Sequence, residues 1–247
     1  MSDQFNRGVV SGKAGTDQLI DEGLRSHMLR VYNYMVTGLA LTGVIAYFVA
    51  STPALLSLFY VQTPQGYLST TTLGWIAILS PLAFVLALSF GISRMKASTG
   101  QILFWLFAGV MGLSLSNIFI IYTGESIARV FFITAATFAA MSLYGYTTKR
   151  DLTGMGSFLM MGLFGIIIAS VVNIFIESTM VQFVVSVLGV LIFVGLTAHD
   201  TQKIKQMYNS LDDSEIAGKK AIMGALSLYL DFINLFLLLL RLFGNRN

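Results

Sequence analysis

Long apolar runs separated by polar connections dominate the pattern along this chain. A helix needs roughly 20 apolar residues to cross about 30 Å of bilayer hydrocarbon. Seven runs approach that length: Val31–Ala50, Leu73–Ile92, Gln101–Tyr122, Arg129–Tyr146, Ser157–Ile176, Val181–Asp200 and Ala221–Leu240. The connection Thr201–Lys220 is polar, and we expect helix near its ends. The pattern predicts an all-α integral membrane protein with seven transmembrane helices and no sizeable soluble domain.

Composition supports this class. Of the 247 residues, 55% are hydrophobic and 11% are charged, and the mean hydropathy is +0.77. An ordinary soluble domain carries about 25% charged residues. The net charge is only +3, and no basic patch with interleaved aromatic residues is present, so we expect the lipid bilayer and no nucleic acid as partner. The absence of cysteine excludes disulfides and thiolate metal sites, and the sequence indicates no bound cofactor.

The basic residues predict the orientation. We divide the chain into a polar cytoplasmic N-terminal arm, residues 1–30, and a seven-helix transmembrane domain, residues 31–247. The arm and the even-numbered connections hold 12 of the 15 lysines and arginines, which places the N-terminus in the cytoplasm and the C-terminus outside. If the last span were re-entrant, both tail arginines would also lie inside. Within the arm, Ile20, Leu24 and Met28 recur at helical spacing, which predicts a short helix on the membrane surface.

Two carboxylates carry the candidate chemistry. Asp200 ends the sixth predicted span, and Asp231 lies well within the seventh. A charge at the bilayer centre costs at least about 2.5 kcal/mol, so such a residue must face the protein interior or water. Asp231 also belongs to a polar stripe with a spacing of 3, 4 and 3, formed by Gly224, Ser227, Asp231 and Asn234. This spacing places the four residues on one face of a helix.

The residues around these carboxylates resemble the Bax inhibitor-1 family, and its bacterial branch in particular. The resemblance lies in the run Leu-Tyr-Leu-Asp-Phe-Ile-Asn-Leu-Phe at 228–236, in the run His-Asp-Thr-Gln-Lys-Ile-Lys at 199–205, and in the seven-span layout. It implies a fold in which a central C-terminal helix is surrounded by six others. It also implies a pH-sensitive calcium leak controlled by an aspartate pair, here Asp200 and Asp231. An arginine near the second helix latches an aspartate in that family, and Arg94 is the nearest counterpart.

The physics of such a leak follows from the pair. Two carboxylates held close cannot both ionise cheaply, so they share a proton at lower pH. As the pH rises they repel, and a cation can lie between them. Calcium prefers six to eight oxygen ligands. Asp200 and Asp231, supported by Thr197, Ser227, Asn234 and water, would form a transient Ca²⁺ site. His199, beside Asp200, is a candidate for tuning the pH response.

Three other interpretations stay open. Asp200 alone fits an interfacial charge, and Asp231 fits a structural hydrogen-bond partner between helices. Presenilin-type proteases also place aspartates in two adjacent spans, but their Gly-x-Gly-Asp motif is absent before Asp231, so we expect no enzyme. A regulatory protein that engages a membrane-bound quality-control protease through its polar arm is the main alternative to a calcium leak. The cell inner membrane of a bacterium is the expected location.

Overall fold

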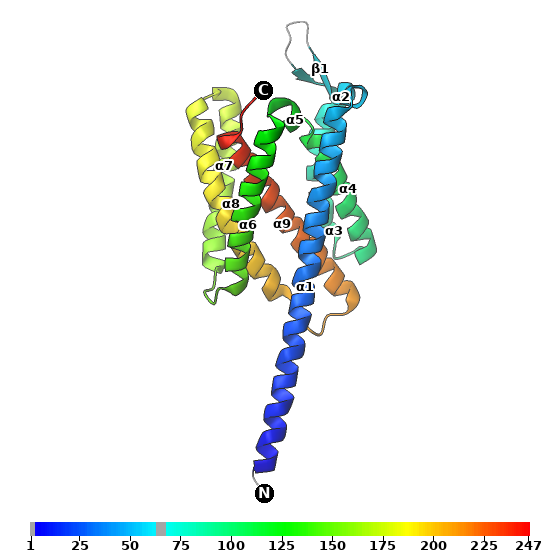
Figure 1. Cartoon of the computed structure of the whole chain (residues 1–247), viewed down its shortest axis with the longest axis vertical. Helices are drawn as coiled ribbons and strands as arrows, with labels where there is room; N and C mark the ends of the chain where they lie inside the picture. Colours follow the sequence, from blue (N-terminus) through cyan, green and yellow to red (C-terminus); the bar gives the residue numbers. More distant parts are fainter. Residues whose placement is uncertain (1–2, 63–67) are drawn as a thin grey trace.

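The computed structural model describes residues 3–62 and 68–247, and the side chains of residues 22–61 and 69–247. Figure 1 shows a bundle of long helices with the N-terminus at one end and the C-terminus at the other. The first half of the chain contains α1 (Asp3–Ser51), α2 (Pro53–Phe59), β1 (Tyr60–Gln62), β2 (Leu68–Thr70), α3 (Thr72–Gly91), α4 (Ala97–Leu115) and α5 (Ile118–Ile121). The second half contains α6 (Gly124–Thr147), α7 (Thr153–Ile176), α8 (Thr179–Met207) and α9 (Ser214–Phe243).

The seven predicted spans are confirmed, although several extend further than the apolar runs. Seven helical segments within the described residues are long and apolar enough to cross a membrane. They are Glu22–Ser51, Thr72–Gly91, Ala97–Ile121, Gly124–Thr147, Thr153–Ile176, Thr179–Met207 and Ser214–Phe243. The third is interrupted between α4 and α5, where Ser116 donates its hydroxyl to the carbonyl of Leu113, a local bond that competes with regular helix.

The N-terminal residues differ from the sequence prediction. Part of the proposed surface helix, including Ile20, lies outside the residues whose side chains are described. From Glu22 onward, α1 continues without a break into the first span, and Met28 is buried in the core of the bundle. Leu24 and Met28 therefore belong to the first long helix. Their apolar side chains serve helix packing, which the helical spacing alone could not distinguish from membrane-surface binding.

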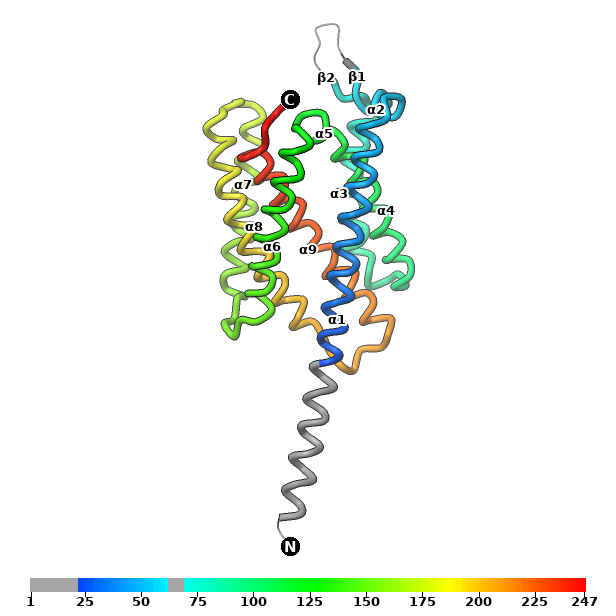
Figure 2. Tube along the Cα trace, in the orientation of Figure 1, coloured from blue at the N-terminus to red at the C-terminus, as the bar shows by residue number. Residues whose placement is uncertain are grey.

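Helix α9 is the central helix of the bundle. It packs against α8, α1, α6, α4 and α3, while α7 packs chiefly on α8 at the periphery. Of its most apolar 18-residue window, 67% is buried, against 6–33% for the other spans. Figure 2 shows α9 running obliquely between α1 and α6. Its core side chains include Leu228, Tyr229 and Leu235, each fully buried.

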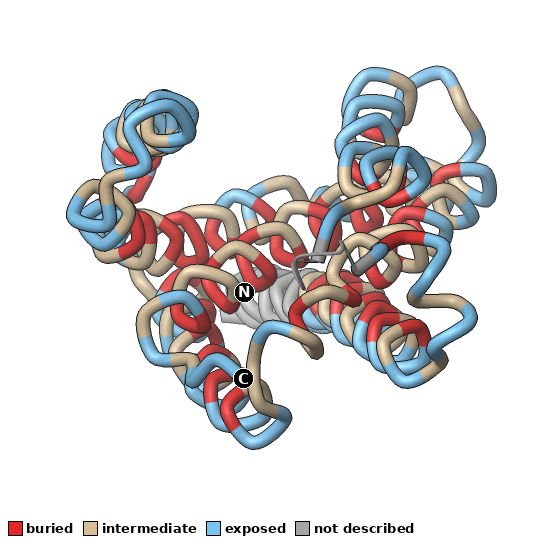
Figure 3. The backbone as a smooth tube through the Cα atoms, turned by 90° about the horizontal axis from the view of Figure 1, so that it is seen from above, coloured by how far each residue is buried: buried red, intermediate tan, exposed pale blue. Residues whose placement is uncertain are grey.

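The outside of the bundle is apolar, as a lipid-facing surface must be. Phe90, Phe175 and Ile174 are 79%, 84% and 70% exposed. Figure 3, which looks along the bundle, shows the buried positions turned inward and the exposed ones around the periphery. Exposed aromatic and aliphatic side chains of this size would form large patches in water, which soluble monomers avoid. The fold is that of an integral membrane protein.

Short connections fix both ends of the bundle. At the end that carries the C-terminus, β1 and β2 pair antiparallel, with Tyr60 opposite Thr70. The C-terminal tail lies against the α5–α6 connection, where the amide of Thr123 donates to the carbonyl of Asn245 at 3.1 Å. At the other end, α9 begins at a capped turn, because the carboxylate of Asp213 accepts from the amide of Ile216 at 2.7 Å.

Candidate functional site

Asp231 lies near the middle of the central helix. It is 17 residues after Ser214, about 26 Å along the helix at a rise of 1.5 Å per residue. The residue is only 5% exposed, and its Oδ2 atom has no hydrogen-bond partner among the described residues. A buried carboxylate without a partner is costly unless it is protonated or meets water or a cation. Asp231 is therefore a functional candidate on its geometry as well as on its sequence.

Asp200 approaches from the neighbouring helix α8. The sequence placed the end of this span at Asp200, but α8 continues to Met207, almost two turns further. That boundary was too early because the last turns of α8 are polar, and polar turns can extend a membrane helix beyond the hydrocarbon. The longer helix sets Asp200 inside the bundle. Its Oδ1 atom lies 2.9 Å from Nδ1 of His199, and its side chain is 22% exposed.

One large cavity contains both aspartates. It has a volume of about 1210 Å³ and is lined by residues of α3, α4, α7, α8 and α9. Asp200, Asp231, Ser227 and Asn234 all line it, so the structure brings together four of the residues that the sequence singled out. The two carboxylates reach this cavity from α8 and α9, which pack closely on one another. The amide of Asn234 is partly used, because its Nδ2 donates to the carbonyl of Leu230 at 2.8 Å.

Three other predicted residues lie elsewhere. Thr197 is fully buried and donates its hydroxyl to the carbonyl of Phe193 at 2.8 Å, outside the cavity lining. His199 reaches the site only through Asp200, and its ring packs beside Gly156 of α7. Arg94 is exposed in the turn between α3 and α4, and the described residues form no ion pair with it. The structure does not bring Arg94 to either aspartate.

The sequence patterns did not predict the polar end of the cavity that lies away from the aspartates. Towards the end of the bundle that carries the C-terminus, the lining includes Asn173, Glu177, Ser178, Gln182 and Arg241. The polar stripe of α9 could have revealed Arg241, because the spacing that joins Ser227, Asp231 and Asn234 continues to this residue. Glu177 follows α7 with a positive φ of 53°, a left-handed conformation that ends the helix. No sequence signal connected it with the aspartates.

The cavity extends along most of the C-terminal half of α9. Ser227 and Arg241 are separated by 14 residues, or about 21 Å of helix. The aspartate pair lies at the end of the cavity that is farther from the C-terminus. Beyond the pair, a hydrogen-bonded cluster links α8, α6 and α1: Thr201 and Ser142 lie 3.0 Å apart, and Ser142 also contacts the hydroxyl of Tyr32. The cavity thus leads from its polar far end, past mainly apolar side chains, to the aspartates.

Few oxygen ligands surround the pair of aspartates. The described residues contain no cluster of three or more histidine, cysteine, aspartate or glutamate side chains suited to a metal ion. With each carboxylate bound through one oxygen, the two carboxylates, the hydroxyl of Ser227 and the amide oxygen of Asn234 give four protein ligands, fewer than the six to eight oxygens that calcium prefers. Water would have to complete the shell.

Comparison with known proteins identifies the family. The family model described as inhibitor of apoptosis-promoting Bax1 matches residues 24–247. This chain belongs to the Bax inhibitor-1 family. A Rickettsia prowazekii relative is 50% identical over 230 residues, which cover 93% of this chain and 94% of the relative. The inner membrane protein YbhL of Escherichia coli K12 is 48% identical over 226 residues, covering 91% and 93% of the two chains.

The resemblance read from the two C-terminal motifs is therefore confirmed for nearly the whole chain. A third member of the Bax inhibitor-1 family, from Caulobacter vibrioides, is 44% identical over 248 residues, covering 97% of each chain. The family is one of membrane proteins and not a recognised class of enzymes. These matches agree with the apolar surface of the bundle, and the protein is an integral membrane protein with an inner membrane relative.

Proposed function

We propose that this protein is a pH-sensitive leak for Ca²⁺, in which Asp200 and Asp231 form both the pH sensor and the transient cation site. The observation that carries the proposal is the buried carboxylate of Asp231, with an unpartnered oxygen, in one cavity with Asp200. Buried ionisable residues in transmembrane segments commonly mark ion or proton pathways.

The pair acts as a switch because its protonation sets its charge. With one shared proton, the two carboxylates hold each other in place and offer little net charge to a cation. At higher pH both ionise, they repel, and a divalent cation stabilises the pair by lying between them. Proton and calcium therefore compete, and each must weaken the binding of the other by the same factor.

The cavity supplies the approach to the pair. Its polar end, with Glu177 and Arg241, lies at the end of the bundle that carries the C-terminus. By the distribution of lysine and arginine, this end is external and the N-terminus is cytoplasmic, in the inner membrane of a bacterium. Release to the cytoplasm requires the cluster of Tyr32, Ser142 and Thr201 to part, which makes that cluster the closed side of the leak.

Asp231 is preceded by Leu228, Tyr229 and Leu230 in place of the Gly-x-Gly that presenilin-type proteases carry, which leads us to favour a leak over an intramembrane aspartyl protease. Proteolysis needs two aspartates that activate a water beside an extended peptide backbone. Here the cavity wall around the pair is formed largely by apolar side chains, among them Leu196, Leu230 and Phe193. Regulation of a membrane-bound protease through residues 1–30 remains a second hypothesis, and no described contact favours it.

The test is calcium flux into liposomes that contain the purified protein and an enclosed calcium indicator. Wild type, Asp231→Asn and the matched control Glu125→Gln are compared between pH 5 and pH 8. Glu125 is an exposed acid in the first turn of α6, far along the chain from the pair. We expect flux that rises with pH in wild type and control, and a weak, flat profile in Asp231→Asn. Equal profiles in all three proteins would refute the aspartate sensor.

A further inference from the structure

Two helices on the opposite side of α9 from the aspartate cavity leave an opening to the bilayer. Helices α1 and α6 each pack closely on α9, but within the described residues they do not pack closely on one another. Figure 1 shows α1 and α6 side by side with α9 behind them. A fissure of about 1050 Å³ lies between the two helices. This volume is at the upper end of the roughly 300–1,000 Å³ of small-molecule sites.

The walls of the fissure are almost entirely apolar. Its floor includes Phe232 of α9, and small residues on both walls leave it open: Ala40, Gly43, Ala135 and Ala139. A methyl group built at Gly43 would meet no atom within 4 Å. Because α1 and α6 are both membrane spans, the fissure faces hydrocarbon and not water. An empty apolar fissure would forfeit dispersion contacts, so a flexible hydrocarbon chain is its natural occupant.

One end of the fissure is polar and basic. Arg25 lines it near the start of the first membrane span, seven residues before Tyr32, whose hydroxyl bonds to Ser142. From Arg25 to Val44 the lining follows 19 residues of α1, or about 28 Å. One acyl chain spans half of a hydrocarbon core of about 30 Å, so the fissure holds a full chain. A guanidinium group also forms two parallel hydrogen bonds with a phosphate.

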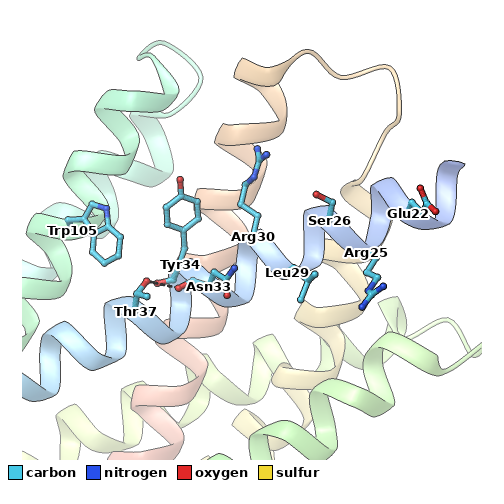
Figure 4. A pocket seen from close by; sticks show the side chains of 9 residues that line it. All are labelled: Glu22, Arg25, Ser26, Leu29, Arg30, Asn33, Tyr34, Thr37 and Trp105. Carbon is cyan, nitrogen blue, oxygen red and sulfur yellow. Dashed lines mark hydrogen bonds between the residues drawn. The ribbon is translucent and has the colours of Figure 1, made fainter.

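Arg30, the next arginine along α1, points away from the fissure. Figure 4 shows Arg25 and Arg30 on opposite sides of α1, with Arg30 on the side of Tyr34 and Trp105. Arg30 does not line the fissure, and Arg25 is the one basic side chain among the described residues that does. Tyr34 and Trp105, whose rings are 6.3 Å apart, are the aromatic pair typical of the level where lipid headgroups begin. The basic end of the fissure is therefore on the headgroup side.

We propose that the fissure between α1 and α6 is a binding site for one phospholipid, with an acyl chain along the apolar walls and the phosphate at Arg25. A long apolar channel that ends at a single cation matches an amphiphile with one anionic group. A helix of a second copy of this chain would bring apolar residues along its whole length and would leave Arg25 without an anion. The positive charge of Arg25 at the end of the fissure therefore favours a phospholipid over a helix of a second copy.

Native mass spectrometry tests the site directly. The purified full chain in a mild detergent is titrated with dioleoyl-phosphatidylglycerol, and bound lipids are counted for each variant. Gly43→Phe and Ala40→Leu fill the fissure, while Gly165→Phe is the matched control. Gly165 is an exposed glycine of α7 with no atom within 4 Å of an added methyl group, and it lies outside the fissure. Arg25→Gln is compared with Arg30→Gln in the same way.

We expect wild type, Gly165→Phe and Arg30→Gln to retain one tightly bound lipid, and Gly43→Phe and Ala40→Leu to lose it. Arg25→Gln should weaken it about fivefold, the factor that corresponds to about 1 kcal/mol for one basic residue at an anionic lipid surface. Far-UV circular dichroism checks that each variant folds; if Gly43→Phe does not, Ala40→Leu and Arg25→Gln decide. Equal binding by all variants, or a wild-type dimer that the filling substitutions dissociate, would overturn the proposal.

Discussion

The hydroxyl of Tyr229 lies 2.6 Å from Oγ1 of Thr42, at the point where α9, α1 and α4 meet. The Thr42 hydroxyl donates its one proton to the carbonyl of Ala108 at 2.8 Å, so Tyr229 must donate to Thr42. The ring of Tyr229 also packs edge-on against Phe107, with centroids 5.0 Å apart. Two residues before Asp231, the central helix is thus attached to two of its neighbours by a chain of buried hydrogen bonds.

Replacing Tyr229 with Phe should remove that hydrogen bond and keep the aromatic packing. Interhelical hydrogen bonds in membrane proteins contribute about 0.6 kcal/mol on average, with a maximum of about 1.7 kcal/mol. We expect a lower Tm of the purified protein in detergent, by a few degrees. Tyr47→Phe is the control, because Tyr47 is 62% exposed. If both substitutions lower Tm equally, the buried hydrogen bond adds no stability of its own.

The contact of Gly145 with α8 should be intolerant of any side chain. A methyl group at Gly145 would overlap the backbone carbonyl of Ala198, two residues before Asp200. Overpacking of this kind costs about 1–3 kcal/mol. We therefore expect Gly145→Ala to lower Tm clearly and to alter calcium flux through displacement of α8. Gly154→Ala, with open space around the added methyl group, should do neither. Unchanged Tm in Gly145→Ala would contradict the close approach of α6 and α8.

His199 should influence the pH response more than Arg94 does. Nδ1 of His199 lies 2.9 Å from Oδ1 of Asp200, whereas Arg94 is exposed and outside the cavity. His199→Phe keeps a ring beside Gly156 and removes the nitrogen. We expect the profile of calcium flux against pH to differ from that of the wild type, because the side chain of Asp200 loses the contact that holds it.

Arg94→Gln is the comparison in the same liposome assay, and we expect its flux and midpoint to match the wild type. The latch of Arg94 on an aspartate is a prediction that this experiment tests as well. It would require movement of the α3–α4 turn towards the cavity. A raised flux in Arg94→Gln at a given pH would support the latch and contradict our expectation from the exposed position of Arg94.

The two aspartates should act as one unit. Either single substitution, Asp200→Asn or Asp231→Asn, removes the same like-charge interaction, so the double substitution should add little to the loss of pH dependence. Calcium flux across pH in the two single variants and the double variant measures the coupling. Clearly additive effects would mean that the carboxylates work separately, and the shared-proton mechanism would then be wrong.

The topology follows from the basic residues and can be tested without any functional assay. The connections rich in lysine and arginine lie at the end of the bundle that carries the N-terminus (Figure 1), and these are expected in the cytoplasm. A C-terminal alkaline phosphatase fusion, active only outside the cytoplasm, should therefore be active, and a C-terminal green fluorescent protein fusion should be dark. The opposite pattern would favour a last segment that does not cross the membrane.

The number of spans and the polar face of the last span follow from the sequence alone. Long apolar runs have no stable alternative in a bilayer but helices, since each backbone group must be bonded within its own segment. The stripe of Ser227, Asp231 and Asn234 likewise fixes one face of α9, because side-chain directions in a helix repeat every 3.6 residues. These are local properties of the chain, and both appear in the structure.

The contacts between helices, in contrast, could not be predicted without the folded structure. The extent of α8 beyond Asp200, the polar lining from Glu177 and Arg241, and the fissure between α1 and α6 depend on packing between segments far apart in the chain. No helical period encodes which neighbour a residue will face. Arg94 is an example. The sequence shows that it follows a span, but its distance from Asp200 depends on the turn after α3 and on the tilt of two separate helices.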